Sequence, residues 1–137
     1  MVRGGPNQLI CVDVPKDDAS WVACGSKGFS RENCEVKIFD LRGSLQQQAA
    51  VACADQTIEA LQCHGDQCFI ASKDGHLRSL ELPEPRVQWE RRGHAAYTAL
   101  GLAAGALLAA SAGPQGLALE LFALDEEPKL LKSSEET

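Results

Sequence analysis

A short strand-like pattern of apolar and polar residues recurs three times along the chain. The three copies occupy residues 36–41, 77–82 and 119–124. Phe39, Leu80 and Phe122 hold the same place in the pattern, at intervals of 41 and then 42 residues. A strand-rich pattern that repeats about every forty residues is typical of a protein built from repeated β units. The pattern therefore predicts an all-β repeat architecture.

Two further apolar runs precede each copy of the pattern, and both predict strands. The runs nearest to it close on serine and occupy residues 21–26, 68–72 and 106–111. The runs before those occupy residues 9–14, 58–63 and 97–102. Short apolar runs bounded by turn residues are typical of strands that are buried on both faces. Each repeat thus supplies at least three strands.

A fourth strand is predicted at the end of each repeat, where the pattern is weaker and partly polar. These segments occupy residues 49–53, 86–91 and 128–132. An exposed outer strand typically has this mixed character. We therefore expect a single domain with a flexible tail at residues 133–137. Its three four-stranded units should occupy residues 9–53, 54–92 and 93–132.

The strongest turn signal lies in the middle repeat. Asp74-Gly75 separates the run that closes on Ser72 from the strand that begins near Leu77. Aspartate and glycine both tolerate the positive φ values of a tight hairpin turn. In the other two repeats the corresponding link differs in length, as expected of surface loops. The second and third strands of each repeat should therefore form a hairpin.

These segments resemble blades of the WD40 β-propeller family. Residues 21–41, in which Phe39-Asp40 stands where that family often has Trp-Asp, resemble the second and third strands of a blade. Ser72 and Asp74 resemble the blade serine and the turn aspartate, and Gly93-His94 resembles the pair that opens a repeat. The resemblance implies antiparallel four-stranded blades. It also implies a role in protein–protein interaction.

The WD40-like pattern covers residues 9–132, which is too short for a closed ring. Propellers close with about four to eight blades, whereas this chain supplies about three. An open wedge of three blades would leave two sheet faces bare and apolar. We therefore expect a partial propeller, which is either a fragment of a longer one or is completed by self-association or by another chain.

Composition and charge restrict the class of protein and its partners. The 137 residues are 45% hydrophobic and 23% charged, which fits one globular domain. The net charge of -6 and the lack of a basic run longer than Arg91-Arg92 argue against a nucleic-acid partner. Residues 1–7 lack the apolar run of a signal peptide, so the six cysteines are expected as reduced thiols rather than as a disulfide framework. We therefore expect a cytoplasmic protein.

Residues 95–116 contain no charged side chain and offer the main alternative to an all-β fold. A helix of this length could span a membrane, and Gly101 and Gly105 form a pattern of small residues that lets membrane helices approach closely. The same segment, however, falls into register with the strands of the first two repeats, and Pro114 interrupts it. We therefore expect strands and no membrane partner, and keep a small membrane-anchored protein as the alternative.

A second alternative is a metal site or a thiol enzyme built on Cys63, His64 and Cys68, with Cys53 or His76 as a further ligand. Structural zinc sites usually have two ligand pairs, and no second pair matches Cys63 and Cys68. The sequence also lacks the hydrolase, phosphate-binding and metalloprotease motifs. We therefore expect no metal, no cofactor and no enzyme activity.

Two loops offer the best candidates for contact with a protein partner. Phe29 and Arg31 lie in the longest loop within a repeat, and aromatic and arginine side chains are enriched at interfaces. Asp74 and His76 lie on the predicted hairpin turn of the middle repeat. We predict that these four residues bind a protein and that the chain is a non-enzymatic interaction module or scaffold.

Overall fold

Twelve strands and no helix make up the described part of the chain. The computed structural model describes residues 9–14, 20–27, 34–42, 44–82, 86–103, 105–114, 116–124 and 128–134. The first sheet contains β1 (Leu9–Asp13), β2 (Trp21–Ser26), β3 (Glu35–Asp40) and β4 (Gln47–Ala52). The second contains β5 (Ile58–His64), β6 (Gln67–Ser72), β7 (His76–Glu81) and β8 (Arg86–Arg92). The third contains β9 (Ala96–Ala103), β10 (Ala106–Gly113), β11 (Gly116–Leu124) and β12 (Pro128–Ser133).

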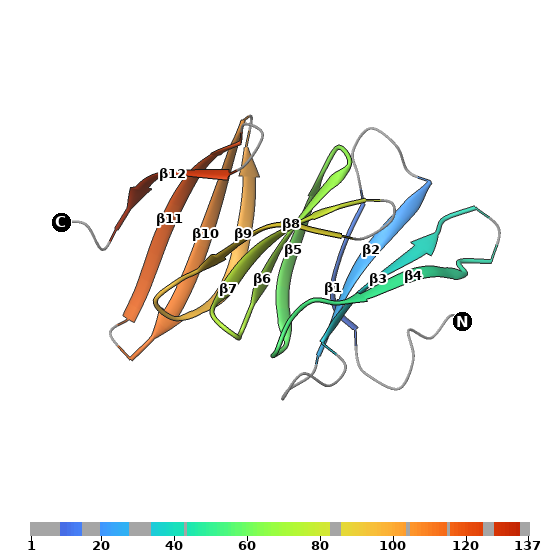
Figure 1. Ribbon diagram of the computed structural model, residues 1–137, viewed down its shortest axis with the longest axis horizontal. Helices are drawn as coiled ribbons and strands as arrows, with labels where there is room; N and C mark the ends of the chain where they lie inside the picture. Colours follow the sequence, from blue (N-terminus) through green and yellow to red (C-terminus); the bar gives the residue numbers. More distant parts are fainter. Residues whose placement is uncertain are drawn as a thin grey trace.

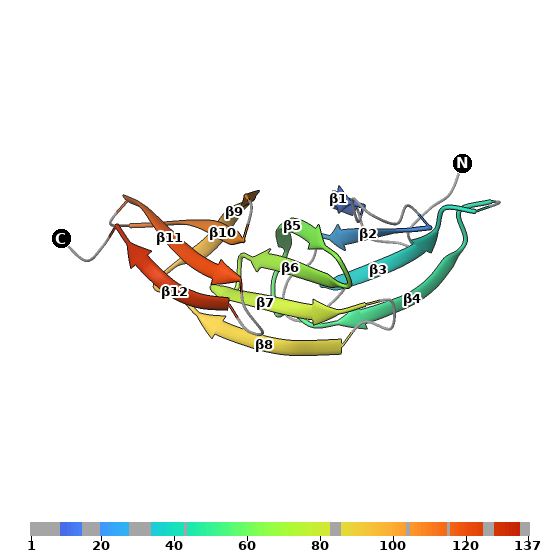
Figure 2. The same cartoon turned by 90° about the horizontal axis from the view of Figure 1, so that it is seen from above.

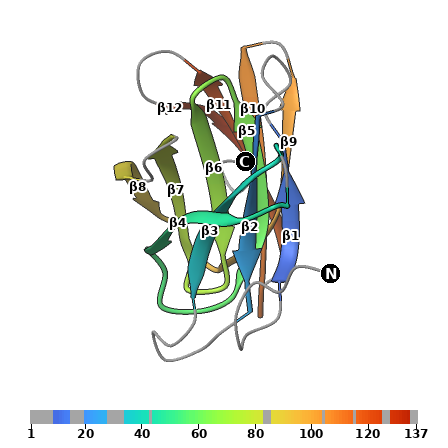
Figure 3. The same cartoon turned by 90° about the vertical axis from the view of Figure 1, so that its right-hand side faces the viewer.

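Each sheet is an antiparallel meander in which the strands follow one another in chain order. The three sheets stand side by side in the order of the sequence (Figure 1). From above, the first strands β1, β5 and β9 lie on one side of the arc, and the fourth strands lie on the other (Figure 2). Seen from the end of the molecule that carries the first sheet, the three sheets stack one behind another (Figure 3). The predicted all-β fold of three antiparallel four-stranded blades is therefore confirmed.

Two backbone irregularities recur at equivalent places in all three sheets. Between the first and second strands, the register shifts next to Ser26, Ser72 and Ser111. Between the third and fourth strands, it shifts just before Phe39, Leu80 and Phe122. A bulge bends and twists the strand that contains it, so its position is a geometric marker. The three sheets are thus copies of one unit in backbone geometry, which defines equivalent residues in the three blades.

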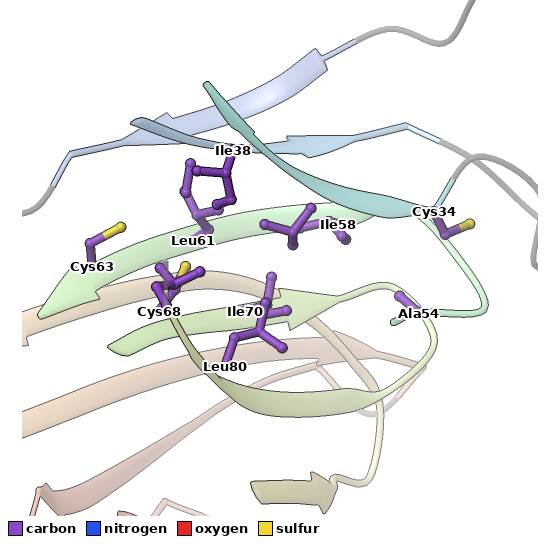
Figure 4. Close-up of a cluster of buried hydrophobic side chains, with 12 residues drawn as sticks. Cys34, Ile38, Ala54, Ile58, Leu61, Cys63, Cys68, Ile70 and Leu80 are labelled. Atoms are coloured by element: carbon purple, nitrogen blue, oxygen red, sulfur yellow. The ribbon is translucent and has the colours of Figure 1, made fainter. Parts of the chain in front are cut away.

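Two hydrophobic clusters hold the three sheets together. The cluster between the first and second sheets includes Ile38, Ile58, Leu61, Ile70 and Leu80 (Figure 4). The cluster between the second and third sheets is centred on Phe69, Leu77, Tyr97, Leu107 and Phe122. Burial of one such side chain stabilises the folded state by about 1.5–3 kcal/mol. Packing between sheets therefore supplies the main stabilisation of the arc.

The uncharged segment at residues 95–116 forms β9, β10 and the start of β11. The alternative of a membrane helix in this segment is therefore wrong. Within the described ranges, no helix is long and apolar enough to cross a membrane. At the end of the sheet, β12 includes Ser133, and the N–H of Ser134 donates to the carbonyl of Leu119 at 2.9 Å. These two residues of the expected tail thus continue the sheet.

Candidate functional site

The hairpin turn between β6 and β7 is organised by the carboxylate of Asp74. The backbone N–H groups of Asp55 and His76 donate to its two oxygens, each at 2.9 Å. The guanidinium of Arg78 donates to the same oxygens at 3.0 and 3.3 Å. Burial by itself would raise the pKa of Asp74, but the hydrogen bonds from Arg78, Asp55 and His76 outweigh it and hold that pKa below its usual value. Asp74 is therefore an ionised group within the turn.

The predicted contact residues of this turn differ in how much surface they offer. The side chains of Asp74 and Arg78 are each 5% exposed, whereas that of His76 is 25% exposed. The imidazole lies between two acids, with Nδ1 3.4 Å from Asp74 Oδ1 and Nε2 3.8 Å from Glu90 Oε1. Gly75 has a φ of 86°, as the predicted turn requires. Asp74 thus fixes the turn, and His76 is the member that reaches the surface.

The other two predicted contact residues, Phe29 and Arg31, lie outside the described residues. The structure therefore brings together Asp74 and His76 and leaves the loop prediction as it stands.

The candidate metal and thiol residues do not form a site in the described part of the chain. Cys63 and Cys68 are cross-strand partners and lie inside the first hydrophobic cluster, whereas His64 is exposed. A hydrogen bond with Cys63, together with burial, raises the pKa of Cys68. Among the described residues, no group of three His, Cys, Asp or Glu side chains could hold a metal ion. These cysteines act as small apolar residues of the core.

Four of the eight large hydrophobic side chains that are exposed in the described ranges lie on the side of the third sheet that faces away from the second. We call this surface the outer face of the third sheet. Its large exposed side chains are Leu108 (43% exposed), Leu117 (69%), Leu119 (41%) and Leu131 (54%). Strands β9, β10 and β11 contain one charged residue, Glu120, which is buried and belongs to the opposite face. The outer face is therefore uncharged across three strands.

Equivalent positions in the first two blades are covered by the next sheet. Leu108 lies three residues before Ser111, just as Phe69 lies three residues before Ser72. In the same way, Leu119 lies three residues before Phe122, and Leu77 lies three residues before Leu80. Phe69 and Leu77 are fully buried in the cluster between the second and third sheets. The outer face of the third sheet therefore has the chemistry of a surface that packs against another sheet.

The fourth strand of the third blade lacks a polar pair that the other two blades have. In the first blade, Gln48 Nε2 donates to Asp40 Oδ2 at 3.0 Å, and in the second, Gln88 Nε2 donates to Glu81 Oε2 at 2.7 Å. The bulges place Leu131 and Ala123 at these positions of the third blade. The two positions that form this polar pair in the other blades are therefore apolar in the third blade.

Comparison with known proteins supports the fold. The chain matches no family model and no curated protein by sequence. It resembles the computationally designed Ika4 protein, with a TM-score of 0.77 at 16% identity over 96% of this chain and 75% of that one. It also resembles the β-propeller domain of Cps50 (Swd1) from Myceliophteria thermophila, with a TM-score of 0.74 at 11% identity over 95% of this chain. These likenesses show a propeller-type fold and nothing finer.

The chain spans less than half of two of the structures that it matches. It covers 44% of the Cps50 chain, and it covers 37% of the designed Ika8 protein, with a TM-score of 0.73 at 16% identity. Both matched chains therefore continue beyond the aligned blades.

The two ends of the arc differ, contrary to the expectation of two bare faces. On the side of the first sheet that faces away from the second, Phe39 is 4% exposed and Cys24 is 7% exposed. Val12 on the same side remains exposed. The central part of this side is therefore buried already. The outer face of the third sheet is the barer end.

A polar group between the second and third sheets was not predicted from the sequence. Arg91 Nη2 donates to Glu120 Oε2 at 2.7 Å, and the hydroxyl of Tyr97 donates to Glu120 Oε1. Burial, and then the bond to Glu120, raise the pKa of Tyr97, while the bond to Glu120 raises that of Arg91. The one sequence signal was a single acid within the otherwise apolar third copy of the repeated pattern.

Proposed function

We propose that this chain is a non-enzymatic protein-interaction module or scaffold of the WD-repeat type. The observation that supports this most strongly is the uncharged outer face of the third sheet, with four leucines exposed by 41–69%. Contiguous apolar surface of this kind marks protein interaction sites on soluble domains. The partner is a protein that presents an apolar surface to this face.

A non-catalytic role is supported by the state of Cys68, one of the candidate thiols. The thiolate, rather than the thiol, is the nucleophilic form of cysteine. Cys68 is fully buried and its pKa is raised, so its thiolate is disfavoured. All six cysteines are free thiols, which supports a location in the cytoplasm.

The hairpin turn is proposed as a second contact region, together with the loop that contains Phe29 and Arg31. Here His76 would touch the partner. Asp74 would hold the turn through Arg78, because its own side chain is almost fully buried. The loop and the turn would add polar contacts to those of the apolar face.

Site-specific photo-crosslinking in an extract of the cells that express the chain tests the proposal. A benzophenone amino acid placed at Leu108 should give a discrete protein adduct. The matched control is Val87, which is 39% exposed but lies on β8 of the second blade. The same adducts from both positions, or none from Leu108, would count against an interaction at the outer face.

A further inference from the structure

Side chains on the outer face of the third sheet are large near one edge of the sheet and small near the other. Residues of β11 on this face are mainly leucines, with Leu119 opposite Ala110 and Leu121 opposite Leu108 on β10. Residues of β9 are small, with Gly101 opposite Leu108 and Ala99 opposite Ala110. A Cβ built on Gly101 would meet no atom within 4 Å. The face therefore rises from small residues at β9 to large residues at β11 and β12.

Such a graded surface is complementary to itself. A two-fold axis that runs parallel to the strands, between β10 and β11, places β11 over β10 and β12 over β9 of a second copy. Leu119 then lies over Ala110 of the second copy, and Leu121 lies over its Leu108. On β12, Lys132 and the bulged Leu131 beside it lie over Gly101 of the second copy. Leu119 thus meets a small residue in each half of the symmetric interface, and Leu121 packs against Leu108 in each half.

Charge is compatible with this arrangement. Lys129 and Lys132 on β12 pair with Ala123 and Leu121 and therefore lie along one edge of the face. The axis sets these lysines over β9 of the second copy, which carries no charged residue. Neither lysine therefore meets a like charge on the facing strand.

The alternative contact with a second copy, head to tail, has less open apolar surface to receive it, although Val12 is exposed there. It would require the outer face of the third sheet to cover the free side of the first sheet. Phe39 and Cys24 in the centre of that side are already buried. A face-to-face contact uses only surface that is open.

The area is sufficient for a weak specific dimer. Four strands about 4.8 Å apart, each about eight residues long, cover roughly 500 Å². Two such faces would bury about 1,000 Å² in all, which lies at the lower limit for specific interfaces. An interface of this size is consistent with a dissociation constant of roughly micromolar order.

We propose that the outer face of the third sheet docks on the same face of a second copy of this chain and forms a two-fold symmetric dimer. The inference rests on the proposed function, because it names the partner of the proposed docking surface. The third sheets of the two copies pack as a sandwich, with Leu108, Leu119 and Leu121 at its centre.

Sedimentation velocity of the purified chain between about 1 and 100 µM, the range expected for such an interface, tests the proposal. The sedimenting species should shift from one copy to two, and Leu119→Glu should weaken the association at least about tenfold, because it buries an unpaired charge. Val87→Glu, at a position of similar exposure on the second blade, is the matched control and should leave it unchanged. A monomer at 100 µM, or a dimer that Leu119→Glu does not weaken, overturns the proposal.

Crosslinking of the purified chain gives a second readout that does not depend on the folding of a charged variant. A benzophenone at Leu131 should form an adduct with β9 of another copy, near Gly101. An adduct with β1–β4 instead would mean a head-to-tail contact and overturn the proposal. A purified monomer that still forms a Leu108-specific adduct with another protein in extract overturns the second-copy partner but leaves the proposed function intact.

Discussion

The guanidinium of Arg91 on β8 lies 2.7 Å from the carboxylate of Glu120 on β11, and this pair joins the second sheet to the third. The hydroxyl of Tyr97 on β9 donates to the other oxygen of the same carboxylate. Arg91 also lies 5.6 Å above the ring of Phe122, and Trp89 meets that ring edge to face at 5.9 Å. Arg91 thus links a buried acid and an aromatic pair at the junction of two blades.

Glu120→Ala should destabilise the fold by about 2–4 kcal/mol, because it leaves the buried hydroxyl of Tyr97 and the half-buried Arg91 without their partner. Urea unfolding followed by tryptophan fluorescence measures the effect, since Trp89 lies beside this group. Glu120→Gln is the control and should cost less, because the amide oxygen can still accept the hydrogen bond of Tyr97. Equal losses for the two variants would contradict this role of the carboxylate.

Acid should weaken the turn that Asp74 organises. The pKa of Asp74 is lower in the folded protein than its usual value near 3.8, so the group stabilises the fold above about pH 4. That contribution is lost as the pH falls through the folded pKa. Between pH 5 and about pH 3, the free energy of unfolding should fall more steeply for the wild type than for Asp74→Asn. Parallel pH profiles from urea titrations would argue against this contribution.

Gly93→Ala should destabilise the junction between the second and third blades by about 1–3 kcal/mol through steric overlap. A Cβ at Gly93 would lie 2.6 Å from the hydroxyl oxygen of Tyr97, and this ring is held by Glu120. Gly101→Ala is the matched control, because a Cβ there meets no atom within 4 Å. Thermal unfolding at low protein concentration compares the two. A melting temperature unchanged by Gly93→Ala would show that the ring moves freely.

The partly exposed thiols should react slowly in the native protein. Burial raises the pKa of Cys11 and of Cys53 from 9.0 to about 11. At pH 8 their thiolate fraction should be roughly 100-fold lower than that of an unperturbed cysteine, and reaction with a disulfide reagent should slow accordingly. The rate should rise with pH towards 11, and all six thiols should react quickly in urea. Fast reaction of two native thiols at pH 8 would disprove this.

The strand pattern of this chain could be predicted because it is local. The spacing of Phe39, Leu80 and Phe122 and the Asp74-Gly75 turn depend on residues that lie close in sequence, and the structure places them as expected. The pairing of Glu120 with Arg91 could not be predicted, because it joins residues 29 positions apart on different sheets. The burial of Phe39 could not be predicted either, because it depends on packing in three dimensions.

The buried side of the first sheet sets a limit on how large an assembly can become. A chain with an exposed contact surface at each end can add copies indefinitely and form a filament, because each contact leaves another surface free. Here Phe39 and Cys24 are already covered at one end of the arc, and the exposed leucines lie at the other. When two copies dock through their third sheets, each covers the exposed leucines of the other, so the assembly stops at two copies.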